Sequence, residues 1–202
     1  MDPEGFRGTV NPYIDPLVDA ADRAGLTPNG VTVIALVVAV AAAGLLALDS
    51  TAGYAGAWLA VTLTGVLDLV DGRLARRTDH ATARGDLLDH AGDRFADAVI
   101  VIGAAAGVGR WPLGLLGLSG VLLAAYLGTQ AQAVGVGRIY RGVLARAGII
   151  ALVATGAAFE ALGVAAGGVR PLVAVIAIFA VLGHATAAQR FVVAWRRLES
   201  VD

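Results

Sequence analysis

The sequence predicts an all-α polytopic membrane protein with six transmembrane helices, folded as one domain over residues 1–202. Of its 202 residues 57% are hydrophobic, and the mean hydropathy is +0.75, whereas soluble domains have roughly 45–50% apolar residues. The excess falls into runs close to the ~20 residues that cross a bilayer. We therefore expect an interfacial segment over residues 1–29 and a six-helix bundle over residues 30–194.

The apolar runs place the six spans in chain order. They are expected at about residues 30–48, 53–75, 87–108, 111–134, 143–165 and 171–194. Each run is long enough to cross the hydrocarbon core of a bilayer as a helix.

The segment before the first span predicts a short juxtamembrane amphipathic helix. Asn11 can cap it, and Pro12 suits the first helical position. One face is apolar and consists of Tyr13, Ile14, Leu17, Val18 and Ala21. The opposite face is acidic and consists of Asp15, Asp19 and Asp22. Such a helix lies at a membrane surface or, as the alternative, packs against the bundle.

Arginine placement predicts the topology. All fifteen basic residues are arginine, and arginine concentrates in cytoplasmic loops. With both termini inside, only Arg110 and Arg170 fall on the outer side. We expect a multi-pass protein of the cell membrane. A net charge of −1 argues against a nucleic-acid partner, and the absence of cysteine excludes thiolate metal sites.

The charged side chains concentrate between Asp68 and Asp97, where the second and third spans meet the cytoplasm. Asp68 and Asp71 share one helix face at spacing i, i+3, and Asp89 and Asp93 share another at i, i+4. A short connection lets the two faces converge. Four carboxylates in a low-dielectric setting repel one another unless cations join them, and oxygen ligands favour Mg²⁺ or Mn²⁺. Two such ions suit phosphoryl displacement.

Small residues and one arginine accompany the acids. Gly72, Ala75 and Gly85 leave room for close approach of a ligand, and Arg76 offers a fork for phosphate. The pattern predicts a phosphate-rich ligand bridged by metals and open to the cytoplasm.

This pattern resembles the signature of the CDP-alcohol phosphotransferase family. The matching positions are Asp68-x-x-Asp71-Gly72-x-x-Ala75-Arg76, eight further residues, and Gly85-x-x-x-Asp89-x-x-x-Asp93. The stretch TPNGVT before the first span is similar to the Pro-Asn element of that family.

The resemblance implies an integral-membrane enzyme of phospholipid biosynthesis, usually a homodimer. Such an enzyme transfers a phosphatidyl or archaetidyl group from CDP-diacylglycerol or CDP-archaeol to the hydroxyl of a small polar acceptor, and releases CMP. The overall look is closest to archaeal members.

Residue roles follow from the same resemblance. Asp68, Asp71, Asp89 and Asp93 would hold the metals, and Asp93 would also be the general base. Gly72, Ala75, Arg76 and Gly85 would line the nucleotide site. Arg138, Arg141 and Arg146 would bind an acceptor phosphate, such as glycerol phosphate or inositol phosphate. Gln130, Gln132 and Gly148-Ile149 depart from the pattern of relatives that use inositol phosphate.

Other interpretations of the acids stay open at this point. A carboxylate-lined cation or proton transporter would also place acids in membrane helices, and so would an aspartate-rich prenyltransferase. Alternatively, the acids pair structurally with nearby arginines. Asp86 and Asp97 lie outside the signature, and for these the structural role is favoured, with Asp97 pairing with Arg94 at i, i+3.

Overall fold

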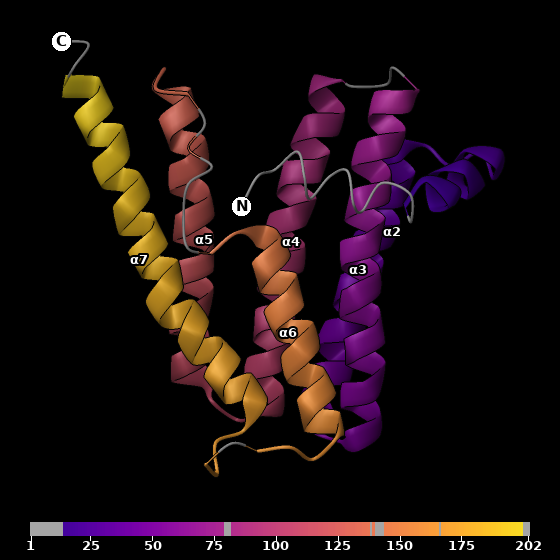
Figure 1. The fold of residues 1–202 in the computed structure, drawn as a ribbon, viewed down its shortest axis with the longest axis vertical. Helices are drawn as coiled ribbons and strands as arrows, with labels where there is room; N and C mark the ends of the chain where they lie inside the picture. The colour runs from indigo at the N-terminus through magenta and orange to yellow at the C-terminus, as the bar shows by residue number, and fades with distance from the viewer. Residues whose placement is uncertain (1–13, 79–81, 138, 140–143, 166, 200–202) are drawn as a thin grey trace.

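The protein is an up-and-down bundle of helices. The computed structural model describes residues 14–78, 82–137, 139, 144–165 and 167–199. After a helical stretch at residues 14–23, the helices are α2 (Pro28–Ala47), α3 (Thr51–Arg77), α4 (Ala83–Gly107), α5 (Trp111–Ala133), α6 (Arg146–Ala161) and α7 (Pro171–Glu199). Successive helices alternate in direction, and Figure 1 shows the turns α2–α3, α4–α5 and α6–α7 at the same end of the bundle. The prediction of an all-helical fold is confirmed.

Hydroxyl side chains set the start of α2, α3 and α4. The side chains of Thr27, Ser50 and Thr82 each accept a hydrogen bond from the backbone amide three residues later, at 3.1 Å in every case. These bonds satisfy amides that have no partner within the helix. In consequence α4 begins at Ala83, several residues before the expected span, and its N-terminal half carries Asp89 and Asp93 of the signature.

Two groups of helices pack around a common apolar core. Helix α2 lies against α3 and α4, and α5 lies against α7. The two groups are joined by α4, which contacts α5, and by α6, which contacts α3 and α7. Glycine allows the closest approach: a Cβ on Gly183 would lie 2.6 Å from the carbonyl carbon of Gly120. Helices α5 and α7 therefore touch backbone to backbone, as small residues permit in membrane bundles.

Four of the described helices are long and apolar enough to cross a membrane, namely α2, α3, α5 and α7. Helix α4 carries Asp93, Arg94 and Asp97 within its length. Helix α6 has 16 residues and is about 24 Å long, less than the ~30 Å of a hydrocarbon core. The span expected at residues 143–165 is thus a shorter helix, and Figure 1 shows it beginning part-way along the bundle.

The N-terminal helix packs on the bundle. Ile14, Val18 and Ala21 are buried in a cluster that includes Val70 and Leu74 of α3. Its acidic face is tied to the same end of α3 by two ion pairs, Asp15–Arg73 at 3.5 Å and Asp19–Arg77. The structure thus favours the alternative of packing against the bundle. The expected cap Asn11, Pro12 and the apolar Tyr13 lie outside the described residues, and a place at the membrane surface stays a prediction.

A polar network joins the helices at the end of the bundle that carries the α2–α3 and α6–α7 turns. Arg170 Nη2 donates to Asp49 Oδ1 at 2.8 Å and to Tyr54 Oη at 2.6 Å, and Arg170 also pairs with Glu160 at 3.1 Å. Hydrogen bonds from Arg170 and Tyr54 lower the pKa of Asp49. The two turns are therefore held to each other by charge as well as by packing.

Candidate active site

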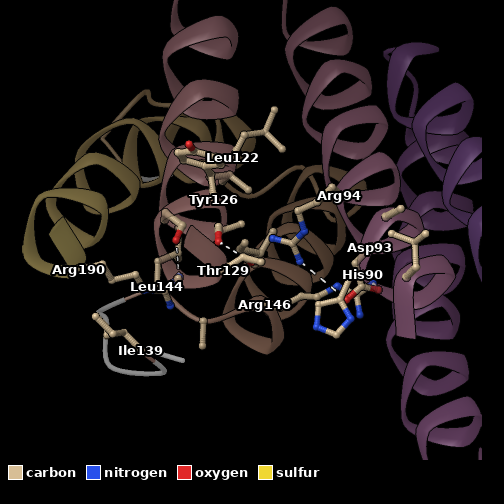
Figure 2. A pocket seen from close by; sticks show the side chains of 18 residues that line it. His90, Asp93, Arg94, Leu122, Tyr126, Thr129, Ile139, Leu144, Arg146 and Arg190 are labelled. Carbon is tan, nitrogen blue, oxygen red and sulfur yellow. Dashed lines mark hydrogen bonds and ion pairs between the residues drawn. The ribbon is translucent and has the colours of Figure 1, made fainter. Parts of the chain in front are cut away.

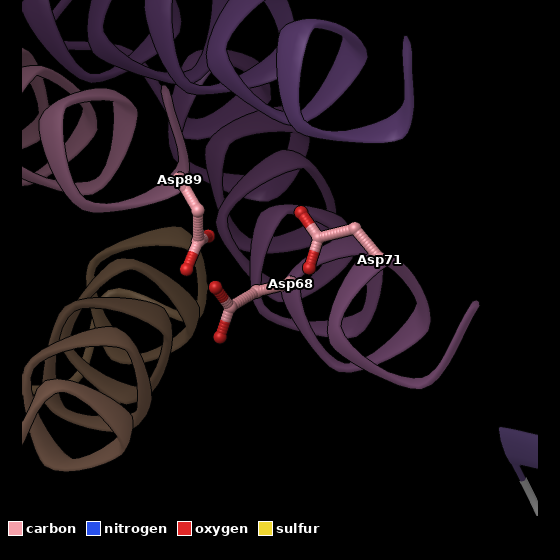
Figure 3. Close-up of side chains that lie close together, drawn as sticks. All are labelled: Asp68, Asp71 and Asp89. Carbon is pink, nitrogen blue, oxygen red and sulfur yellow. The ribbon is translucent and has the colours of Figure 1, made fainter. Parts of the chain in front are cut away.

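Three aspartates converge between α3 and α4. Asp68 and Asp71 project from α3 and Asp89 from α4, and Figure 3 shows their carboxylates directed into one space. One oxygen from each lies within 4.8 Å of the others. An all-oxygen cluster of this size fits a hard divalent cation such as Mg²⁺ or Mn²⁺, and the predicted metal ligands Asp68, Asp71 and Asp89 are thus brought together.

Asp71 is held in place by a residue that the sequence interpretation had not singled out. Thr32 Oγ1 on α2 donates a hydrogen bond to Asp71 Oδ2 at 2.8 Å, within the buried interior. Asp71 is 5% exposed, so this bond compensates part of the cost of burying its carboxylate. Thr32 belongs to the TPNGVT stretch, and that motif was the available signal.

The fourth signature aspartate, Asp93, pairs with an arginine. Asp93 Oδ1 lies 2.8 Å from Arg146 Nη2, and Arg146 Nη1 donates to Asp68 Oδ1. Arg146 is the first residue of α6, so the part-way start of that helix brings it to the depth of the aspartates. Arg146, which is predicted to bind an acceptor phosphate, therefore contacts two predicted metal ligands, Asp68 and Asp93.

A cavity of about 380 Å³ opens on one side of the aspartates, between α2, α3 and the start of α4. Its lining includes all four predicted nucleotide-site residues and two of the aspartates: Gly72, Ala75, Arg76, Gly85, Asp71 and Asp89. A Cβ on Gly72 would meet only the guanidinium of Arg76, at 3.6 Å, so the helix surface here is open. We refer to this space as the α2–α3–α4 cavity.

A second cavity, of about 520 Å³, opens on the other side, between α4, α5, α7 and the start of α6. We refer to it as the α4–α5–α7 cavity. Figure 2 shows Asp93, Arg94 and Arg146 along one side of it and Arg190 at the other. Arg190 donates to the carbonyl of Ala124; the sequence alone predicts no role for it beyond a place on the cytoplasmic side. Arg138 and Arg141 lie outside the described residues.

The two cavities flank the acidic cluster. Asp89 lines the α2–α3–α4 cavity, and Asp93, one helical turn later, lines the α4–α5–α7 cavity. Two ligands that entered from opposite sides would therefore meet at the carboxylates. The arrangement suits a transfer between two substrates.

The acids outside the signature have other contacts. Asp86 lies at the surface, with Oδ1 3.3 Å from His90 Nδ1. Asp97 Oδ2 lies 3.3 Å from Arg94 Nη2, which confirms the predicted pair. Asp97 also lies 3.6 Å from Arg146 Nε, a contact that spacing along α4 alone does not indicate.

Comparisons with known proteins agree with this geometry. A family model for CDP-alcohol phosphatidyltransferase matches residues 25–195. Archaetidylinositol phosphate synthase of Methanothermobacter thermautotrophicus is 33% identical over 201 residues, covering 96% of this chain and 94% of that protein.

Two crystal structures of phosphatidylinositol phosphate synthase from Mycobacterium tuberculosis share the fold. The first, in complex with manganese and citrate, has a TM-score of 0.73 at 26% identity and covers 90% of this chain and 88% of the solved one. The second, with CDP-DAG bound, has a TM-score of 0.72 at 27% identity and covers 90% and 93%.

Proposed function

The chain belongs to the CDP-alcohol phosphatidyltransferase family, and from this premise we propose that it transfers a phosphatidyl or archaetidyl group from a CDP-linked lipid to inositol phosphate. The observation that carries the proposal is the pair of cavities that flank one acidic cluster. Family membership confirms the resemblance carried by the signature. It is inconsistent with the transporter and prenyltransferase interpretations of the same acids.

The α2–α3–α4 cavity would receive the cytidine diphosphate part of the donor. Gly72, Ala75 and Gly85 leave its walls open, and Arg76 lines it with a positive charge suited to phosphate. The related enzyme with CDP-DAG bound supports this assignment. The lipid chains of CDP-diacylglycerol or CDP-archaeol would extend along the apolar outer surface of the helices.

Asp68, Asp71, Asp89 and Asp93 would hold two Mg²⁺ or Mn²⁺ ions. The converging oxygens of the first three support this role, as does manganese in the related crystal structure. When bound, the ions would neutralise the diphosphate and make CMP a better leaving group.

Asp93 would act as the general base. It lines the α4–α5–α7 cavity beside the cluster, where it would take the proton of the acceptor hydroxyl. The acceptor oxygen would then bond to the lipid-bearing phosphorus, and the anhydride bond would break with its bridging oxygen leaving on CMP. General bases placed in this way contribute roughly 10²–10⁴ in rate.

The acceptor phosphate would lie in the α4–α5–α7 cavity. Arg94, Arg146 and Arg190 lend it positive charge, and Thr129 adds a hydroxyl. The names of the related synthases specify inositol phosphate products, which favours inositol phosphate over glycerol phosphate despite Gln130 and Gln132. Arg138 and Arg141 stay predictions for the same site.

The finer membrane arrangement belongs to the same proposal. All six helices, α4 and α6 included, would cross the membrane as one domain, with the N-terminal helix at its surface. The active site would face the cytoplasm, because the arginines gather at that end. The chain would work as a homodimer, as members of the family usually do.

The test is release of CMP by the purified full chain in detergent. CDP-diacylglycerol and CDP-archaeol would each be offered with inositol phosphate, glycerol phosphate, serine and inositol, with Mn²⁺, Mg²⁺ or EDTA. We expect metal-dependent release with inositol phosphate that is absent in Asp93→Asn. Release with glycerol phosphate alone would overturn the acceptor assignment, and no release from a folded sample with any pair would overturn the reaction.

A further inference from the structure

Asp97 is a buried carboxylate that the proposed reaction does not use. It lies one helical turn beyond Asp93 on α4, and its side chain is 0% exposed. Neither carboxylate oxygen has a hydrogen-bond partner among the described residues. Within the part of the chain that the structure describes, the cations that face it are Arg94 Nη2 at 3.3 Å and Arg146 Nε at 3.6 Å. Burial of an ionised carboxylate is costly unless a counter-ion compensates it, so these arginines are essential to its position.

Arg146 is shared among three carboxylates. Its two terminal nitrogens contact Asp68 and Asp93, and its Nε faces Asp97. The guanidinium is a rigid planar fork, so its edges can serve different acids at once. Asp97 faces the Nε edge of the guanidinium, and the proposed metal ligands Asp68 and Asp93 contact its two terminal nitrogens.

Cations and Arg146 compete for the same acids. Asp68 and Asp93 cannot bind metal ions with their full charge while they are paired with the terminal nitrogens of Arg146. Arg146 therefore needs a carboxylate partner that remains available when Asp68 and Asp93 bind the metal ions. Of the three acids it contacts, Asp97 alone lies outside the proposed metal set.

We propose that Asp97 is a positioning residue that acts through Arg146. It holds the guanidinium at the boundary between the acidic cluster and the α4–α5–α7 cavity through the Nε edge, and it remains the counter-ion of Arg146 when Asp68 and Asp93 bind the metals. This inference rests on the proposed function, because it assigns the metal ligands as that proposal does. Without Asp97, the remaining carboxylate partners of Arg146 are the metal ligands themselves.

The test is a double-mutant cycle on Mn²⁺ affinity, measured without any substrate. Electron paramagnetic resonance of free Mn²⁺ would give dissociation constants for the parent chain, Asp97→Asn, Arg146→Met and the double variant, all full length in detergent. Charges that act on the cation independently give additive effects. We expect Asp97→Asn to weaken Mn²⁺ binding at least about tenfold more when Arg146 is present than when it is methionine. Equal losses in both backgrounds, within about twofold, would overturn the proposal.

A second variant keeps the test decisive if Asp97→Asn does not fold, as judged by thermal melting. Asp97→Glu keeps the charge but moves it by one methylene, so a purely electrostatic role predicts unchanged Mn²⁺ affinity in both backgrounds. Positioning predicts a loss of Mn²⁺ affinity that requires Arg146, and unchanged affinity in folded Asp97→Glu would overturn it.

The cycle is independent of turnover. An additive cycle in a chain that binds Mn²⁺ and releases CMP overturns this inference alone. A non-additive cycle in a chain that does not turn over inositol phosphate supports it and overturns the acceptor assignment instead.

Discussion

Replacement of Thr32 by valine tests how the structure holds Asp71. Valine matches threonine in shape, so the change removes the hydroxyl that donates to Asp71 Oδ2 at 2.8 Å and leaves the packing of α2 on α3 intact. A hydrogen bond to a charged group contributes about 1.5–3 kcal/mol. If the bond orients Asp71 for the metals, its loss weakens Mn²⁺ binding by roughly 10–100-fold, as for other groups that orient metal ligands.

A matched control is available one helix away. Thr64 on α3 is buried like Thr32, and its hydroxyl donates to the carbonyl of Ala60 in its own helix at 3.0 Å. Thr64→Val therefore makes the same chemical change without removing a hydrogen bond to an aspartate. Both variants would be titrated with Mn²⁺ by electron paramagnetic resonance, with thermal melting to verify folding. An Mn²⁺ dissociation constant for Thr32→Val within about threefold of that for Thr64→Val would refute the orienting role.

Three further predictions concern the other parts of the molecule. Asp93→Asn should lower CMP release by roughly 10²–10⁴-fold while CDP-lipid binding persists, and loss of binding in step with activity would contradict a role as base. Arg190→Met should raise the KM for the acceptor phosphate at least about tenfold with little change in kcat, and a fall in kcat alone would place Arg190 outside the acceptor site. Asp49→Asn should lower the melting temperature by roughly 1–3 °C at neutral pH. Arg170 and Tyr54 lower the pKa of Asp49 below its ordinary value of 3.8. The stabilisation by the Asp49 carboxylate is therefore fully present above pH 3.8 and disappears as the pH falls through the lowered pKa of the folded state. A melting difference that stays constant into strong acid would contradict the prediction.

Much of the candidate site could be predicted from local patterns in the sequence. Spacings i, i+3 and i, i+4 put two aspartates on each helix face, and the short connection between α3 and α4 makes those faces meet. The three converging carboxylates of Asp68, Asp71 and Asp89 follow from these facts alone. The hydroxyl cap at Thr82 is local as well, although hydropathy alone does not indicate that the helix begins at Ala83, before the span expected from residue 87.

The sequence by itself determined the helical class and the family signature, and four residues of that signature, Gly72, Ala75, Arg76 and Gly85, line the α2–α3–α4 cavity. These features depend on helix period, composition and motif spacing, which are local. Only the tertiary structure decided which partners the acids have on other helices. Thr32 meets Asp71 across 39 residues, and Arg146 meets Asp68 across 78. The second contact depends on where α6 begins along the bundle, and hydropathy placed that start at residue 143 in a full-length span. How far along one helix a residue of a neighbouring helix lies is set by packing between the helices. The periodicity of either helix alone does not predict it.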